Sequence, residues 1–345
     1  MNPIKPPLLS PGALLALLSP SWGGPAAYPP VFEAGKAMLA ENFGFRFVEY
    51  PTTRWTAEQL DQDPQARARD FNQAFADPKV EGLLATIGGN DAIRILPFLD
   101  LDLIRRNPKL VMGYSDATAY LTWLSQNGVV SYYGNTVMSG WPQMASFPPA
   151  LDWHRQFFQG EVPALEPFPF WTQGYRNWNT SANQVLEPQP NSGFTWLGGD
   201  GTTRGRLWGG CFEVLEMLKG TRFWPSRDFW NHRVLFLETS EEKPLPRQVT
   251  YWLRNYGAMG VFGQLSALWI GRPKDYTDAE KAELRRVVKG VVGEEWGAVG
   301  LPIVMDLDFG HTDPRWVLPL GIEVETDPQN RRLSFTEPLF SGLSP

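Results

Sequence analysis

A serine with the surroundings of a nucleophile lies in segment 113–116, whose sequence is Gly-Tyr-Ser-Asp. An apolar run, residues 109–112, precedes this segment, and a run with a helical pattern, residues 120–124, follows it. A strand, a tight turn and a helix in this order lift a serine hydroxyl out of a sheet. The glycine permits the sharp turn, and the first amides of the helix point toward a developing oxyanion. The pattern predicts a serine hydrolase with Ser115 as its nucleophile.

A serine hydroxyl needs a base to take its proton, and a carboxylate that orients the base completes such a site. The chain contains only three histidines: His154, His232 and His311. His311 lies in an aspartate-rich loop that directly follows the apolar run 301–305. Glu238 suits the third role because it closes the apolar strand expected over residues 234–237. We therefore expect Ser115 to meet His311 and Glu238 in a cleft between two domains.

Each of these residues also has a second interpretation. Ser115 could cap the helix that follows, since serine and aspartate are common at helix N-termini. Glu238 could be a solvated residue at a strand end. His311 could bind a metal, although no second histidine or cysteine lies at ligand spacing. Gly88 and Gly89, after another apolar run, could cradle a phosphate, but they lack the known glycine-rich patterns; as an oxyanion loop they need to supply only one amide.

Composition limits the class of protein. A chain of 345 residues corresponds to roughly two domains of about 150 residues each. The net charge of −6, without any cluster of Lys or Arg, disfavours nucleic acid and anionic membranes as partners. The single Cys211 excludes an intramolecular disulfide framework, and its place at an expected helix start indicates a buried residue and not a nucleophile. The apolar run 13–18 is too short to span a bilayer, so we expect a cytoplasmic protein.

The first 150 residues alternate between strand-like and helix-like patterns. This alternation predicts a parallel sheet with helices on both faces, whose functional sites lie at the carboxyl ends of the strands. Gly88, Gly89 and Ser115 all follow such ends. The expected strands cover residues 13–18, 45–50, 82–87, 109–112 and 129–133, and the main expected helices cover residues 29–41 and 57–76.

The rest of the chain divides into two parts. Residues 151–205 are rich in Pro, Asn, Gly, Thr and aromatic residues, and we expect them to connect the domains and shape the site. The boundaries predicted are a nucleophile domain over 1–150, this connection, and a domain over 206–345 that carries Glu238 and His311. In the last domain we expect strands over 233–238, 265–270 and 303–306, helices over 247–256 and 278–292, and a tail in which 317–321 pairs with 322–325, followed by strand 332–335.

Several motifs occur together in an order that identifies a family. They are 19–21 (SPS), 88–91 (GGND), 113–116 (GYSD), 205–210 (GRLWGG), 238–244 (ETSEEKP), 271–273 (GRP) and 308–312 (DFGHT). With these motifs the chain resembles the LD-carboxypeptidase family of serine peptidases, and within it the branch of the microcin C immunity peptidase. The resemblance implies an α/β protein with a flavodoxin-like N-terminal domain, built on a parallel sheet, and a smaller β-rich α+β C-terminal domain.

The resemblance also implies roles for the residues singled out above. Ser115 is the nucleophile, His311 the general base and Glu238 the residue that orients the base. The backbone amides of Gly89 and Asp116 form the oxyanion hole. The implied reaction proceeds through an acyl-enzyme that is hydrolysed by water activated by His311, without any metal or cofactor, in an enzyme that is commonly a homodimer.

Two substrate classes follow from the resemblance. One is a murein tetrapeptide that loses a terminal D-alanine, and the other is a peptidyl or aminoacyl group joined by an amide to a nucleotide. Run 238–244 and the aromatic connection resemble the branch that acts on the nucleotide conjugate, and the aromatic rings of that branch can stack on a base. The same rings could instead line a dimer interface. We expect Asn90, Trp178 and Thr239 among the substrate contacts. A binding protein for such ligands, without turnover, is the alternative from another class.

Overall fold

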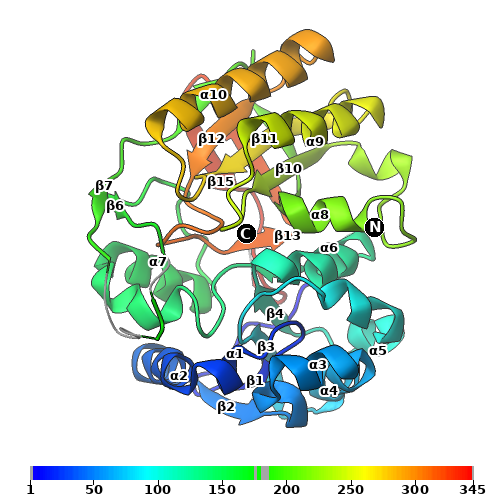
Figure 1. Cartoon of the computed structure of the whole chain (residues 1–345), viewed down its shortest axis with the longest axis vertical. Coiled ribbons are helices and arrows are strands. Elements are labelled where there is room, and N and C mark those ends of the chain that lie inside the picture. The colour runs from blue at the N-terminus through cyan, green and yellow to red at the C-terminus, as the bar shows by residue number, and fades with distance from the viewer. Residues whose placement is uncertain (1–2, 175–176, 180–185, 344–345) are drawn as a thin grey trace.

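The computed structural model describes residues 3–174, 177–179 and 186–343. Its N-terminal half contains a parallel sheet surrounded by helices, shown in blue to cyan in Figure 1. The parallel strands are β1 (Leu14–Leu18), β2 (Arg46–Glu49), β3 (Val80–Ala85), β4 (Leu110–Gly113) and β5 (Ser131–Tyr133). The helices are α1 (Gly24–Ala27), α2 (Pro29–Phe43), α3 (Ala57–Gln62), α4 (Pro64–Ala76), α5 (Leu101–Arg106) and α6 (Thr118–Gln126). The expected alternation of strands and helices is confirmed.

The single helix predicted over residues 57–76 is instead two helices. Asp63 lies between α3 and α4, and its side chain accepts a hydrogen bond from the amide of Ala66, which caps the second helix. Pro64 occupies the first turn of α4, where its missing N–H leaves no intrahelical bond unmade. The proline and the cap together explain why the chain breaks at this point.

One strand of the N-terminal sheet comes from near the end of the chain. Strand β13 (Leu318–Leu320) pairs antiparallel with β5, so that the order of the sheet is β13-β5-β4-β3-β1-β2. The predicted pairing of residues 317–321 with residues 322–325 is therefore wrong. Leu318 and Leu320 are fully buried beside β5, and Pro319 is tolerated because an edge strand needs hydrogen bonds on one side only.

The C-terminal half forms a second sheet with a parallel centre and antiparallel edges. Its strands are β8 (Thr195–Leu197), β9 (Thr203–Cys211), β10 (Arg233–Glu238), β11 (Leu265–Gly271), β12 (Ile303–Leu307), β14 (Glu323–Asp327) and β15 (Arg332–Phe335). Their order is β15-β14-β9-β10-β11-β12-β8, and β9 to β12 run parallel. The accompanying helices are α8 (Phe212–Leu218), α9 (Pro246–Ala258) and α10 (Asp278–Lys289). Figure 1 shows α9 and α10 lying side by side over this sheet.

The connection between the halves contains more regular structure than its many glycines and prolines indicated. It includes α7 (Pro148–Phe158), the two-stranded ribbon of β6 (Phe170–Trp171) with β7 (Gln189–Pro190), and strand β8 of the second sheet. Short 3₁₀ turns elsewhere cover Pro51–Arg54, Ala92–Phe98, Ser115–Ala117, Trp141–Ser146 and Arg227–Trp230, and a π-helical turn covers Gly290–Glu295. Among the described residues, no helix is long and apolar enough to cross a membrane.

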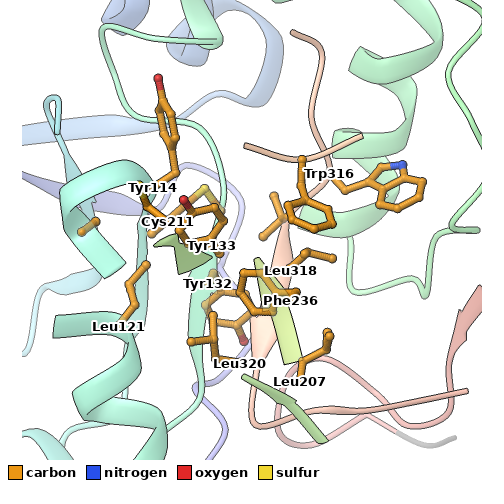
Figure 2. Packing of buried hydrophobic residues seen from close by; sticks show 14 of the residues in the cluster. Tyr114, Leu121, Tyr132, Tyr133, Leu207, Cys211, Phe236, Trp316, Leu318 and Leu320 are labelled. Atoms are coloured by element: carbon orange, nitrogen blue, oxygen red, sulfur yellow. The ribbon is translucent and has the colours of Figure 1, made fainter. Parts of the chain in front are cut away.

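The two sheets share a hydrophobic core. Tyr133 on β5 packs against Phe236 on β10, with ring centroids 5.4 Å apart, and Figure 2 shows Leu318 and Leu320 of β13 beside them. Helix α6 contacts both β9 and α8, which adds a second set of contacts between the halves. Because this core fixes the sheets against each other, the ends of β4, β10 and β12 can contribute side chains to one site.

Candidate active site

Ser115 lies at the sharp turn that the sequence predicted, between β4 and α6. Its φ of 60° is in the left-handed region, which is uncommon for a residue with a side chain and persists only where the surroundings hold it. The amide of Ser115 donates a hydrogen bond of 3.1 Å to the hydroxyl of Tyr133. A Cβ added to Gly88 would lie 2.9 Å from the Cβ of Ser115. A glycine is therefore needed where this second loop approaches the serine.

The carboxylate of Asp116 joins the serine turn to the glycine loop. It is fully buried and accepts hydrogen bonds from the amides of Asp91 and Ala92, at 2.9 and 2.7 Å, and from the hydroxyl of Ser21. Burial raises the pKa of Asp116, and these hydrogen bonds partly oppose that rise. A Cβ on Gly89, whose φ is 150°, would lie 2.1 Å from the Oγ of Ser21. The backbone around both expected oxyanion amides is thus tightly fixed.

A buried ion pair joins the other two predicted catalytic residues. Nδ1 of His311 lies 2.7 Å from Oε2 of Glu238, and both side chains are almost completely buried. Gly310 has a φ of 99°, and a Cβ there would lie 2.7 Å from Oε2 of Glu238, so only glycine allows this approach. The hydroxyl of Tyr133 donates to the other carboxylate oxygen, Oε1. Tyr133 therefore contacts both the orienting acid and the backbone of Ser115.

The loop that carries His311 is held by the connection between the halves. Asp308 is fully buried and pairs with Arg272 at 2.6 Å, and it also accepts a hydrogen bond of 2.8 Å from the amide of Phe168. Further along the loop, the backbone of Asp313 exchanges hydrogen bonds with Thr172. Because charge-assisted bonds in the interior hold their geometry, residues 168–172 fix the position of the histidine loop.

A second carboxylate faces the other nitrogen of the histidine. Oε2 of Glu241 lies 3.0 Å from Nε2 of His311, and the Glu241 side chain is 42% exposed. Burial opposes the charged form of His311, but Glu238 and Glu241 outweigh it and raise the pKa of His311 well above 6.5. Burial likewise raises the pKa of Glu241, whereas its contact with His311 lowers it, with a net value of about 2. Both carboxylates therefore favour the protonated form of His311.

A cavity of about 350 Å³ opens at Ser115. Aromatic rings form one part of its wall: the rings of Tyr28 and Trp178 meet edge to face at 5.3 Å, and those of Trp22 and Tyr28 lie 6.1 Å apart. The described residues that line it are Trp22, Tyr28, Ile87, Gly88, Gly89, Tyr114, Ser115, Asn177, Trp178, Asn179 and Glu241. The combination of a serine hydroxyl, backbone amides and aromatic rings suits a small ligand with both polar and planar parts.

The structure brings most of the predicted site residues together. Ser115, Gly89 and Trp178 line the cavity. Asn90 is exposed beside Gly89, and Thr239, the first residue after β10, is buried; neither is among the described lining residues. Both stay predictions as substrate contacts. Of the aromatic segment expected to shape the site, residues 175–176 and 180–185 lie outside the described residues.

Sequence reasoning missed two residues that contact His311 or its partner. Tyr133 ends an apolar strand, and its hydroxyl gives no signal in the sequence that distinguishes it from an ordinary core tyrosine. Glu241 lies in a Glu-Glu-Lys run typical of a solvated turn. The available signal was its distance of three residues from Glu238, which is short enough for both acids to reach one histidine.

One other histidine and the cysteine weighed for a catalytic role are buried residues of the core. His154 is buried next to Trp141, and burial lowers its pKa to about 4, so it stays neutral. Cys211 is buried as predicted, and burial raises the pKa of its thiol well above the ordinary range, which disfavours the thiolate that a nucleophile requires. The ranges that the structure describes contain no group of three His, Cys, Asp or Glu side chains arranged to hold a metal ion.

Comparisons with known proteins give consistent results. The family model described as the LD-carboxypeptidase N-terminal domain matches residues 15–134, and the one described as the LD-carboxypeptidase C-terminal domain matches residues 204–326. The microcin C7 self-immunity protein MccF of Escherichia coli is 28% identical over 310 residues, which cover 86% of each chain.

Solved structures with the same fold include complexes with nucleotides. MccF in complex with glutamyl sulfamoyl guanosine superposes with a TM-score of 0.83 at 25% identity, covering 98% of this chain and 100% of that chain. An MccF-like protein from Streptococcus pneumoniae in complex with AMP superposes with a TM-score of 0.84 at 23% identity, covering 94% and 98% of the two chains. At 23% identity, the match to the Streptococcus pneumoniae protein shows a shared fold only.

Proposed function

Because this chain belongs to the LD-carboxypeptidase family of serine peptidases, we propose that it hydrolyses the amide between an aminoacyl or peptidyl group and a nucleotide. The observation that carries the proposal is the buried pair of His311 and Glu238, 2.7 Å apart, which Tyr133 links to the backbone of Ser115. A base that is fixed by a carboxylate next to a strained serine is the arrangement that acyl transfer requires.

The proposed reaction has two steps. In the first, neutral His311 takes the proton of Ser115 through Nε2 while the serine oxygen attacks the acyl carbon. The amides of Gly89 and Asp116 donate to the developing oxyanion. His311 then gives the proton to the leaving nitrogen, so that the amide breaks and an ester on Ser115 remains. In the second step His311 activates a water that hydrolyses the ester, and Glu238 holds the imidazole in the required tautomer throughout.

The wall of the cavity supports a nucleotide as the leaving group. Trp22, Tyr28 and Trp178 present aromatic rings in the same cavity as Ser115. Stacking of a base on an aromatic ring contributes about 1–3 kcal/mol and tolerates different bases. MccF has been solved with aspartyl sulfamoyl adenosine and with glutamyl sulfamoyl guanosine, which carry different bases. These observations favour the nucleotide conjugate over the murein tetrapeptide.

The assembly and location of the protein are also proposed. The family resemblance favours a homodimer, and the sequence pattern favours the cytoplasm. The net charge of −6 favours a small-molecule conjugate as partner over nucleic acid or a membrane surface.

Incubation with two candidate substrates tests the proposed function. We expect the purified protein to convert alanyl sulfamoyl adenosine, in which a sulfamoyl group replaces the phosphate and the acyl amide is kept, into free alanine and the nucleoside sulfamate. Mass spectrometry detects both products. A murein tetrapeptide, incubated in parallel, should stay intact. Release of D-alanine from the tetrapeptide alone would indicate a murein carboxypeptidase instead, and retention of both compounds unchanged would indicate a binding protein.

A further inference from the structure

The carboxylate of Glu241 occupies the space in front of the catalytic base. It lies 3.0 Å from Nε2 of His311, which is the nitrogen that must take the proton of Ser115. Within the described part of the chain Nε2 makes no hydrogen bond of good geometry, so its contact with Glu241 is an ion pair. Glu241 also lines the cavity together with Ser115. A single side chain thus contacts both the base and the space for substrate.

The position of Glu241 is built into the fold. The carboxylate of Glu213, at the start of α8, accepts hydrogen bonds from the amide and the hydroxyl of Ser240, at 2.9 and 2.7 Å. The turn then closes with a bond from the amide of Lys243 to the carbonyl of Ser240, and Lys243 adopts a φ of 50°. This turn directs Glu241 toward the cavity.

The lysines near Glu241 are engaged with other groups. Nζ of Lys243 pairs with Glu280 at 3.1 Å. Nζ of Lys274 pairs with Asp275 at 2.9 Å and bonds the carbonyl of Gln173 at 3.1 Å, although its charge also favours the ionised form of Glu241. Among the described residues that line the cavity, Glu241 is the only one with a formal charge. The cavity therefore presents a negative charge and aromatic rings, both of which attract a cation.

We propose that Glu241 binds the free α-ammonium group of the acyl residue of the substrate. This inference rests on the proposed function. The α-carbon is bonded to the carbonyl carbon that Ser115 attacks, so an α-ammonium group of the bound substrate lies close to the serine and the base. Glu241 is the anionic side chain at that place. The substrates selected are aminoacyl conjugates with a free amino group. Of the two acyl groups proposed above, the peptidyl group, which is acylated on that nitrogen, is disfavoured.

Binding of the ammonium group also prepares the base. When the ammonium group pairs with the carboxylate of Glu241, His311 loses one of the two anions that stabilise its protonated form. The positive charge of the ammonium group also destabilises that form. Both changes favour the neutral form of the imidazole. Nε2 becomes free to accept the proton of Ser115. Glu241 thus stabilises the protonated form of His311 until a substrate with an α-ammonium group binds.

A pair of isosteric substrates tests the inference. In lactyl sulfamoyl adenosine a hydroxyl replaces the α-ammonium of alanyl sulfamoyl adenosine, with little change in size. Because a hydrogen bond to a charged group is lost, we expect the wild-type kcat/KM to be roughly ten- to a hundredfold higher for the alanyl compound. Glu241→Gln should bring the ratio of the two values near unity. Glu242→Gln, which removes an equal charge from the same turn outside the described lining residues, should keep the wild-type ratio.

The outcomes separate this inference from the proposed function. Equal cleavage of both compounds by the wild-type protein, or an alanyl preference that survives in Glu241→Gln, would overturn the role of Glu241 while the hydrolase stands. Loss of the preference in Glu242→Gln as well would show a general effect of charge and would also overturn the role. If the wild-type protein cleaves neither compound, the proposed function fails and the inference fails with it.

Discussion

Ser115→Ala is expected to lower kcat by about three to six orders of magnitude on alanyl sulfamoyl adenosine. The expected loss is large because the proposed acyl-enzyme forms on the Ser115 hydroxyl, and the single cysteine, Cys211, is buried with a raised thiol pKa. Alanine should adopt the φ of 60° at this position no less readily than serine, so the exchange removes the hydroxyl without adding backbone strain. Steady-state release of alanine, followed by mass spectrometry, measures the effect.

Two controls make this result specific. Thermal unfolding of Ser115→Ala should match that of the wild-type protein, and Ser125→Ala on α6, outside the cavity lining, should retain full activity. A Ser115→Ala protein that is folded and releases alanine at the wild-type rate would exclude the serine as the nucleophile.

Glu238→Gln is expected to lower kcat by about 10⁴-fold, the loss that follows when the acid of a catalytic triad is replaced by its amide. The carboxylate accepts from both His311 and Tyr133, and an amide group can accept through only one of its two heteroatoms. The glutamine therefore fails to hold the imidazole in the tautomer whose Nε2 accepts a proton. Initial rates across pH measure both the size of the loss and its origin.

The pH dependence distinguishes a catalytic role for Glu238 from a merely structural one. Glu238 and Glu241 raise the pKa of His311, so the wild-type kcat/KM should fall as pH drops below that raised pKa, and Glu238→Gln should move this limb to lower pH. The His311–Glu238 pair also stabilises the folded state. This stabilisation is fully present below the pKa of His311 in the unfolded chain, about 6.5, and is lost as pH rises through the pKa of His311 in the folded protein. Glu238→Asp, which keeps the charge but shortens the reach, should retain part of the activity. A limb that stays in place in Glu238→Gln would contradict this account.

The fold was predictable wherever local pattern decides the structure. The apolar run before Ser115 and the helical run after it sufficed for the turn, and the strand before Glu238 had a clear boundary. The pairing of β13 was not predictable, because Leu318 and Leu320 can cover either sheet and only the shared core selects β5. Local pattern specifies elements, whereas long-range partners depend on packing that no short segment encodes.

Some contacts of the site could likewise be predicted from the sequence, and others could not. The approach of His311 to Glu238 could be expected because both follow strands of the same domain, and the structure places them 2.7 Å apart. The contacts of Tyr133 and Glu241 depend on side-chain directions within a few ångströms. Residues of these types occur in cores and solvated turns for other reasons, so their identity alone does not indicate a role.

Reaction with an activated ester tests the central claim, an acyl-enzyme on Ser115, most directly. With alanine p-nitrophenyl ester, acylation is fast relative to deacylation, so nitrophenol should appear in a burst equal to the enzyme concentration. Acid quenching during the burst, followed by peptide mapping, should locate the added alanyl group on the peptide that contains Ser115. An alanyl group on any other residue, or a burst of the same size in Ser115→Ala, would contradict the claim.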